Sequence, residues 1–421
     1  MTITHAYSEN KEKEFYDNLA IEVTSEKFLS DYENYLKIVK NEALERSCAD
    51  FINRNYDDFF YKTGQRNNED EFQLKVSEYC TFIVNFTETV TPKSLFLEQK
   101  EFVANFMLWT YIYDDTVTSF IDKLNANTLD RVVGNELVKS LNNYVFNAWK
   151  DGLKGNRDNY EQSIIFDKFP SLRDLADISF LFGVQLSQLI SEETSPLIDV
   201  VSIEFSSFLE GLTEQSGGAP KTEYSYFERH KKTGGIKLFF NINFLFLANN
   251  MGASFDVTKF SQVLLNPLVE SYYSAGEDCI IYSNDASGAK DMGGDDESLL
   301  AIYIGKRFKF LRLNTARDHG QVLAKYLGKK IGFRSMLELN TNLRAAFLKF
   351  NTRLEKIRKE SLDRATQASL ADAVIPWVYG YHLFSPQSSR YGSAFKAYMI
   401  ALTGDFKAYK SYLKKFKRSE Y

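Results

Sequence analysis

The feature that most limits the fold of this chain is the recurrence of apolar side chains at helical spacing. Phe102, Phe106, Trp109 and Tyr113 stand at i, i+4, i+7 and i+11, so they would share one face of an α-helix. Strand signals are scarce, and the 421 residues include only seven prolines. This pattern predicts an all-α, single-domain helical bundle of about ten or more helices. Comparable stripes occupy 180–190, 200–212, 236–247, 263–281, 299–313, 337–357 and 369–379.

No internal repeat or low-complexity linker divides the chain. We therefore predict one domain over residues 41–421, preceded by an N-terminal leader over 1–40 that is ordered at most in part. The N-terminus lacks the apolar core of a signal peptide. The most apolar stretch, Ile236 to Leu247, is interrupted by Lys237, Asn241 and Asn243, which makes it too short and too polar to cross a bilayer. We expect a cytoplasmic protein without membrane insertion.

Charge and cysteine content argue against a nucleic-acid-binding protein, a disulfide-rich protein and a zinc protein. The net charge is −5 and no long basic stripe is present, so we expect no nucleic-acid partner. Cys48, Cys80 and Cys279 are few, odd in number and widely spaced, so they predict neither a disulfide framework nor a zinc site. A reducing, intracellular setting fits these cysteines. Composition leaves the oligomeric state open between a monomer and a homodimer.

Two adjacent aspartates follow the aromatic stripe. Thr91-Pro92 is a good N-cap and first-turn pair, and the helix that it would open carries Asp114 and Asp115 at its C-terminal end. Neighbouring carboxylates on an apolar helix cost desolvation and mutual repulsion unless a cation is present. Oxygen ligands of this kind suit Mg²⁺. The alternative interpretation, a solvated helix end, stays open at this point.

A second polar run follows Ile280-Ile281-Tyr282. Ser283, Ser287 and Asp291 fall at i, i+4 and i+8, and Asn284, Ser287 and Asp291 fall at i, i+3 and i+7, so either set would share one helical face. Lys290 is adjacent and could reach a phosphate oxygen. The same residues also favour a turn, which is the alternative interpretation.

Two further segments combine basic and aromatic residues with glycines. In the first, Tyr224 to Gly235, Arg229, His230 and two lysines precede Gly234-Gly235, where a broken helix would expose backbone groups to a ligand. The second segment, Trp377 to Tyr391, ends in an Arg-Tyr pair beyond a proline turn that could donate hydrogen bonds to a phosphate.

Taken together and in this order, the four segments resemble the motifs of class I terpene synthases (terpene cyclases) of the microbial or animal type, such as those of soft corals or amoebae. In the motif D-D-x-x-D/E, Asp114 and Asp115 match and Thr118 replaces the third acid. In N-D-x-x-S-x-x-K-E, Ser283 takes the asparagine position and Asn284-Asp285 come one residue late. The residues that match its latter half are Ser287, Lys290 and Asp291.

The remaining two motifs match with further departures. In the diphosphate-sensing motif Y-L-x-x-R-R-x-T-x-G, His230 takes the position of the sensor arginine and Arg229 lies one residue earlier. The residues that match are Tyr226, Phe227, Lys231, Thr233 and Gly235. The last motif reads W-x-x-G-N-L-x-W-S, then four residues, then R-Y, and Phe384 replaces its second tryptophan. The residues that match are Trp377, Gly380, Ser385, Arg390 and Tyr391.

The resemblance implies a class I terpenoid synthase fold, a helical bundle around a central apolar cavity, and an isoprenyl diphosphate substrate with three Mg²⁺ ions. It implies a lyase whose metal ligands are Asp114, Asp115, Ser283 or Asn284, Ser287 and Asp291. Arg229 or His230 would sense the diphosphate, and Lys290, Arg390 and Tyr391 would clamp it. Aromatic faces could stabilise a carbocation in a dry pocket. The candidates for that pocket are Phe82, Phe106, Trp109, Tyr113, Phe205, Phe208, Gly234, Phe239 and Trp377.

The chain length and its insertions favour C20 geranylgeranyl diphosphate as substrate, with C15 farnesyl diphosphate next. Two alternative functions remain open from sequence. One is a chain-elongating prenyltransferase, although its second motif would be rich in aspartate. The other is a non-catalytic carrier of hydrophobic ligands on the same scaffold, which the irregular motifs allow.

Overall fold

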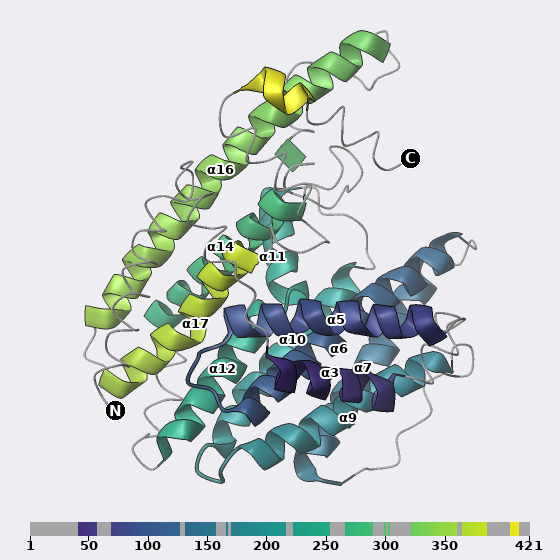
Figure 1. The fold of residues 1–421 in the computed structure, drawn as a ribbon, viewed down its shortest axis with the longest axis vertical. Coiled ribbons are helices and arrows are strands. Elements are labelled where there is room, and N and C mark those ends of the chain that lie inside the picture. Colours follow the sequence, from purple (N-terminus) through teal and green to yellow (C-terminus); the bar gives the residue numbers. More distant parts are fainter. Residues whose placement is uncertain are drawn as a thin grey trace.

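The computed structural model is helical throughout the part of the chain that it describes, which confirms the all-α prediction (Figure 1). That part comprises residues 41–56, 69–126, 131–156, 166, 170–215, 222–252, 266–288, 299, 302–303, 321–359, 364–384 and 405–411. Its main helices are α3 (Glu42–Asn55), α5 (Glu69–Val90), α6 (Leu97–Ala126), α7 (Arg131–Lys154), α9 (Ser171–Leu189), α10 (Ile198–Gln215), α11 (Glu223–Thr233), α12 (Ile236–Met251), α14 (Pro267–Gly288), α16 (Gln321–Lys359) and α17 (Arg364–Phe384). The predicted leader, residues 1–40, lies outside the described residues.

Small residues let the helices approach closely. A Cβ on Gly152 of α7 would lie 2.1 Å from the carbonyl oxygen of Phe180, and one on Gly183 of α9 would lie 2.3 Å from that of Trp149. The two backbones therefore touch where the glycines face each other. Gly380 of α17 has the same role against α5, because its Cβ would lie 2.1 Å from the carbonyl oxygen of Thr89. Helix packing alone thus requires a glycine at this motif position.

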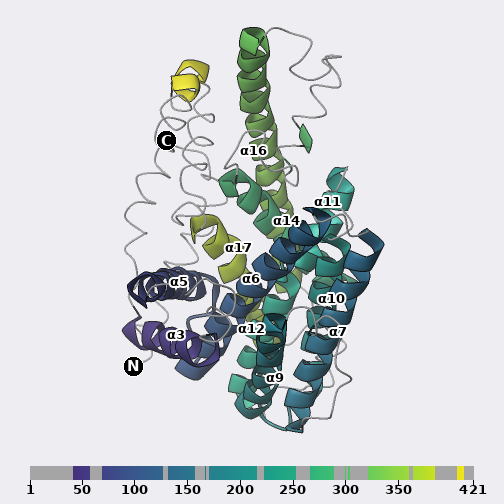
Figure 2. The ribbon, with the colours of Figure 1, turned by 90° about the vertical axis from the view of Figure 1, so that its right-hand side faces the viewer.

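The longest described helix, α16, forms one flank of the molecule beside α14 and α17 (Figure 1). A Cβ on Gly276 of α14 would lie 3.1 Å from Cγ1 of Val374 and 3.2 Å from Cγ2 of Val378, so the glycine lets α17 pack closely against α14. Figure 2 shows that α14 and α11 lie toward the end of the bundle to which the C-terminal part of α6 also extends. The chain thereby brings together elements that are far apart in sequence.

Helix α12 fills the centre of the bundle. Its residues from Leu238 to Ala248 are all buried, including Asn241 and Asn243. A helix that is apolar all round is buried on every side, which explains why this stretch is the most apolar one in the sequence. Among the described residues, no helix has the length and apolarity needed to cross a membrane.

The structure corrects the expected start and end of the helix that carries the aspartate pair. Thr91 does not cap that helix: its hydroxyl donates to the carbonyl of Thr87 at 2.7 Å, at the C-terminal end of α5, and α6 begins at Leu97. Helix α6 also continues to Ala126, so Asp114 and Asp115 lie in its interior and not at its C-terminal end. The apolar spacing itself continues past the pair, because Val117 follows Tyr113 at i+4 and is also buried.

Candidate functional site

The aspartate pair lies where α6 turns from a buried to an exposed surface. Tyr113 is fully buried, Asp114 is partly buried and Asp115 is exposed. Oδ1 of Asp114 is itself shielded from solvent. Thr118 continues the helix, but its side chain lies outside the described residues. The pair therefore combines one sheltered and one accessible carboxylate on adjacent residues.

The polar run after Ile281 is helical, which favours the helical interpretation over the turn. Helix α14 continues to Gly288 and includes Ser283, Asn284, Asp285 and the backbone of Ser287. Ser283 is 0% exposed and Asp285 is 4% exposed, whereas Asn284 is only partly buried. The side chain of Ser287, and all of Lys290 and Asp291, lie outside the described residues.

The predicted break after the basic segment is present. Helix α11 ends at Thr233, Gly234 follows it, and Gly235 has a left-handed φ of 56° before α12 begins. A positive φ strains residues with a side chain, so the second glycine is required by the backbone. A Cβ there would only reach ordinary contact with the ring of Phe208, at 3.4 Å, so the backbone angle and not crowding requires the glycine.

The basic side chains of α11 point to different neighbours. The ring of His230 stacks on Tyr226, with the ring centroids 3.8 Å apart. Nη1 of Arg229 is shielded from solvent. Lys231 forms an ion pair with Asp278 at 3.2 Å and donates to Ser274 at 2.9 Å, so it is engaged with α14. Arg229 and His230 therefore both remain candidates for the diphosphate sensor.

Three of the four motif segments meet in direct hydrogen bonds. The hydroxyl of Tyr226 on α11 donates to both carboxylate oxygens of Asp285 on α14, at 2.8 Å each. From α17, the hydroxyl of Tyr381 donates to Oδ1 of Asn284 at 2.8 Å. These partners are 59 and 97 residues apart in sequence. The order of motifs in the sequence thus corresponds to one cluster of side chains in space.

Helices α14 and α17 are also joined by a second side-chain contact. Oγ of Ser283 lies 3.0 Å from Nδ1 of His382 on α17. Burial lowers the pKa of His382 to about 4, so its imidazole is neutral around neutral pH. Tyr381 and His382 were not predicted as site residues, although they stand at the N and L positions of the motif W-x-x-G-N-L. This difference from the motif is the sequence feature that could have identified Tyr381 and His382 as site residues. Arg390 and Tyr391, which follow, lie outside the described residues.

Several predicted pocket residues form an aromatic cluster between α6, α7, α9 and α10. The indole of Trp109 donates to the carbonyl of Leu175 at 2.9 Å, and the hydroxyl of Tyr113 donates to Oδ1 of Asn142 at 2.7 Å. These bonds aim the polar ends of both rings at α9 and α7. The rings of the cluster lie within 6.4 Å of one another in successive pairs, and its members are Phe106, Trp109, Tyr113, Trp149, Phe182, Phe205 and Phe208.

A second aromatic group lies between α5 and α17 and is joined to the first through α12. Phe82 packs on Phe384 with the ring centroids 5.1 Å apart. Phe239 of α12 stacks on Trp377 at 5.2 Å and also contacts Phe106 at 5.8 Å. A continuous aromatic layer therefore runs from α6 to the helix that carries Tyr381. Contact with substrate remains a prediction for all of these rings, and so does the central apolar cavity.

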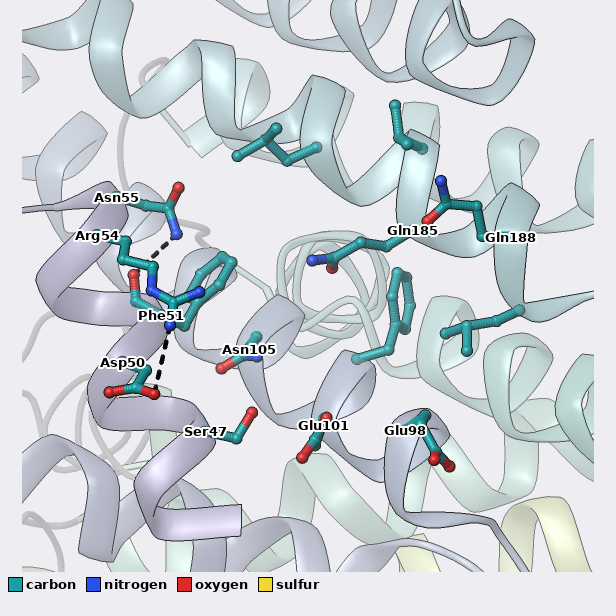
Figure 3. Close-up of a pocket in the computed structure, with 14 residues that line it drawn as sticks. Ser47, Asp50, Phe51, Arg54, Asn55, Glu98, Glu101, Asn105, Gln185 and Gln188 are labelled. Atoms are coloured by element: carbon teal, nitrogen blue, oxygen red, sulfur yellow. Dashed lines mark hydrogen bonds and ion pairs between the residues drawn. The ribbon is translucent and has the colours of Figure 1, made fainter. Parts of the chain in front are cut away.

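A cavity of about 740 Å³ opens elsewhere, between α3, α6 and α9 (Figure 3). It is lined by the first turns of α6, including Glu98, Glu101 and Asn105, and by Gln185 and Gln188 of α9. The lining residues of α6 all precede Asp114 by more than two helical turns. The cavity is therefore separate from the hydrogen-bonded motif cluster, and its lining is too polar for an isoprenyl chain.

Other reactive groups are sealed in the core. Burial raises the pKa of the Cys80 thiol to about 12, and it also raises the pKa values of Cys48 and Cys279. Thiols in that state are poor nucleophiles and poor metal ligands. Glu277 of α14 is 4% exposed, and burial raises its pKa to about 8 although Lys231 and Lys237 act against that rise.

The donor atoms that the structure describes fit Mg²⁺ by type. Asp114, Asp115 and Asn284 all offer oxygen, the element that Mg²⁺ prefers. Within the described part of the chain, no three His, Cys, Asp or Glu side chains gather into a metal site of their own. A Mg²⁺ site built from these described residues would take its remaining ligands from water or substrate oxygens.

No protein-family model and no curated protein matches the sequence. Solved structures do resemble the fold. Germacradien-4-ol synthase from Streptomyces citricolor gives a TM-score of 0.51 at 15% sequence identity, and the match covers 81% of this chain and 94% of that chain. The crystal structure of a-eudesmol synthase gives 0.50 at 13% identity, with 82% and 95% covered. Such low identities establish an architecture and not a reaction. The chain therefore has an all-α helical bundle that resembles the fold of bacterial class I terpene synthases.

Proposed function

We propose that this protein is a Mg²⁺-dependent terpene cyclase, a lyase that releases pyrophosphate from an isoprenyl diphosphate and cyclises the remaining carbocation. C20 geranylgeranyl diphosphate is the favoured substrate and C15 farnesyl diphosphate is next. The similar solved proteins are synthases by name, which is consistent with this activity. A closer kinship with soft-coral or amoeba cyclases stays a prediction from the motifs.

The observation that carries the proposal is the contact between motif segments. Tyr226 holds Asp285, and Tyr381 holds Asn284, so the segments for diphosphate sensing, metal binding and closure meet at one point on α14. Helices α11 and α17 each pack against α14 in this fold, and these bonds place polar residues of three motif segments in contact there. Buried polar contacts of this kind also fix side-chain geometry, which a diphosphate site needs.

The candidate residues would have two roles, metal binding and diphosphate binding. Asp114, with Asp115 as helper, would hold Mg²⁺ from α6, and Asn284 or Ser283 with Ser287 and Asp291 would hold it from α14. Bound Mg²⁺ would neutralise the diphosphate and so make it a better leaving group. Arg229 or His230 would sense the diphosphate, and Lys290, Arg390 and Tyr391 would donate hydrogen bonds to it.

The aromatic layer would serve the hydrocarbon end of the substrate. Its rings exclude water, which would otherwise quench an allylic cation. Each ring face that meets the cation could stabilise it by about 0.5–2 kcal/mol. Phe239 and Trp377 are the best placed, because they connect α6 with the helix that carries Tyr381.

The decisive experiment offers C10, C15 and C20 isoprenyl diphosphates to the purified protein with and without Mg²⁺. Pyrophosphate release is measured, and hexane extracts are analysed by GC-MS. We expect Mg²⁺-dependent release together with a cyclic hydrocarbon or alcohol, most rapidly from the C20 substrate. Consumption of added isopentenyl diphosphate would instead identify a prenyltransferase, and tight substrate binding without any release would identify a carrier.

The sensor is tested by comparing Arg229→Ala with His230→Ala in steady-state turnover. Lys232→Ala is the matched control, because Lys232 lies on the same helix but forms its ion pairs with Glu210 and Glu214 of α10. We expect one of the two sensor variants to lose about 100-fold or more in kcat. Equal activity of all three variants would show that the segment has been misassigned.

A further inference from the structure

The cavity between α3, α6 and α9 has no role in the proposed function (Figure 3). Its volume of about 740 Å³ is that of a site for a small molecule and far exceeds that of a bare ion. Each of the three helices presents polar side chains to it: Asp50 and Arg54 from α3, Glu101 and Asn105 from α6, and Gln185 and Gln188 from α9. A ligand in this cavity would therefore meet polar groups on three sides.

The charge of the lining is negative. Among the described lining residues, Asp50, Glu98 and Glu101 are acidic and Arg54 is basic. Arg54 forms an ion pair with Asp50 at 3.6 Å on its own helix. No lysine or arginine of the described ranges pairs with exposed Glu98 or with partly buried Glu101. The last turn of α9 also lines the cavity without a basic residue, and a helix C-terminus carries partial negative charge. The lining therefore favours a cation over an anion.

Two groups of α6 in this lining are poorly compensated. Burial raises the pKa of Glu101; a hydrogen bond from Ser47 opposes this rise, and the charge of Glu98 adds to it. One turn further along, Asn105 is 6% exposed, and its Oδ1 accepts no hydrogen bond from any described residue. A buried carbonyl is costly without a donor, and a carboxylate is stabilised by a neighbouring cation. A cation that carries N–H groups would satisfy both side chains.

The walls of the cavity distinguish an organic cation from a metal ion. Within the described ranges, His, Cys, Asp and Glu side chains form no group of three that could hold a metal. The buried rings of Phe51 and Phe102 line the cavity, and aromatic faces attract organic cations. Gln185 and Gln188 add amide oxygens as acceptors. These features together fit ammonium groups that are joined by methylene chains.

We propose that this cavity binds an organic cation of the polyamine class. Its ammonium groups donate hydrogen bonds to Glu101 and Asn105, and its methylene groups lie against the two phenylalanine rings. The cavity is separate from the hydrogen-bonded motif cluster, so this inference goes beyond the proposed function and does not rest on it. The test requires neither isoprenyl diphosphate nor turnover, so the failure of one proposal leaves the other unaffected.

The experiment measures spermidine binding to the full chain by isothermal titration calorimetry. Gln185 is partly buried in the lining, so it allows a test in both directions. Gln185→Lys places an ammonium group in the cavity and should weaken spermidine binding about 10-fold or more, whereas Gln185→Glu adds a carboxylate and should tighten it about 3-fold or more. Glu101→Gln removes a charged acceptor and should weaken binding about 10-fold.

Glu45→Gln is the matched control for Glu101→Gln. Both glutamates are partly buried, but Glu45 of α3 does not line the cavity. Each change makes the net charge of −5 less negative by one, so the two variants differ only in the local contact. Glu45→Gln should bind spermidine within about 2-fold of wild type. Thermal unfolding of every variant verifies that the protein titrated is folded.

Three results would overturn the inference. The first is equal binding by Gln185→Lys and Gln185→Glu, or tighter binding by the lysine variant. The second is an equal loss in Glu101→Gln and Glu45→Gln, which would show a general attraction to an acidic protein. The third is no binding by wild type up to about 10 mM spermidine. A parallel titration in MgCl₂ and in NaCl of the same ionic strength should give equal affinities; stronger competition by Mg²⁺ would identify a metal site and contradict the proposal.

Discussion

The aspartate pair of α6 and two acidic residues of α14, Glu277 and Asp285, occupy opposite environments. Asp114 is partly buried and Asp115 is exposed, on a helix whose other face is packed with aromatic rings. On α14, Glu277 and Asp285 are each 4% exposed, and Asp285 accepts two hydrogen bonds from Tyr226. Exposed carboxylates can take a cation from solution, whereas buried ones are held by the protein itself. The two helices therefore contribute different things: α6 offers charge, and α14 offers fixed geometry.

The largest effect that this comparison predicts is the loss of activity in Asp114→Ala. If α6 supplies the charge that holds Mg²⁺, Mg²⁺-dependent pyrophosphate release should fall at least about 1000-fold. Thermal melting of the same variant separates a loss of metal binding from a loss of folded protein.

Glu98→Gln is the control for that variant, since it removes an exposed acid from the first turn of the same helix. Steady-state turnover and thermal melting of both variants complete the measurement. Full activity in Asp114→Ala would contradict the assignment of α6 to metal binding.

The second prediction concerns pH and the buried acid Glu277. Its pKa rises on folding from 4.5 to about 8, chiefly through burial. The folded state therefore binds more protons than the unfolded state between these values, and stability falls as the pH rises through that window. Glu277→Gln removes this loss, so the variant should become more stable than wild type by roughly 2–5 kcal/mol at pH 9 and by little at pH 4.5.

Urea denaturation of both proteins at several pH values measures this difference. Glu270→Gln on the same helix is the comparison, because Glu270 is exposed and forms an ion pair with Lys237. A constant difference between wild type and Glu277→Gln across the pH range would show that Glu277 is ionised in the folded protein.

The third prediction concerns the bond between α11 and α14. Tyr226→Phe removes the hydroxyl that donates to Asp285 and leaves a buried carboxylate with less compensation, which should destabilise the fold by about 1–3 kcal/mol. Tyr224→Phe is the matched control, since Tyr224 is on the same helix but is 76% exposed. Its change should stay within about 0.5 kcal/mol. Equal unfolding free energies for the two variants would mean that the bond to Asp285 contributes nothing to stability.

Local patterns in the sequence predicted the helices and the break between them. The aromatic stripe of α6, the helical spacing after Ile281 and the Gly234-Gly235 break all depend on neighbours within a few residues, and all three are present. The interior position of Asp114 was missed, although Val117 continues the apolar stripe one turn beyond Tyr113. Thr91 was misread because a Thr-Pro pair looks like a helix start even where the threonine closes the preceding helix.

The partners of the polar run could not be predicted in the same way. Tyr381 and His382 reach Asn284 and Ser283 across 97 and 99 residues, and no local pattern encodes which helices pack together. The motif showed only that both residues depart from the usual pattern. Only the packing of the helices shows that the residues of α17 that differ from the motif contact the residues of α14 that differ from theirs.

The smallest effect expected is on stability in Asp115→Asn, and it tests the comparison most finely. Asp115 is exposed, so the exchange of one oxygen for an amide should change the free energy of unfolding by no more than about 0.5 kcal/mol. Activity should nevertheless fall, by less than in Asp114→Ala, because the proposed function makes Asp114 the direct ligand of the ion and Asp115 its helper. Chemical denaturation and the Mg²⁺ dependence of turnover measure the two properties separately. If Asp115→Asn were as destabilising as Tyr226→Phe, the division between a helix that offers charge and a helix that offers geometry would fail, since the acids of α6 would then also support the fold.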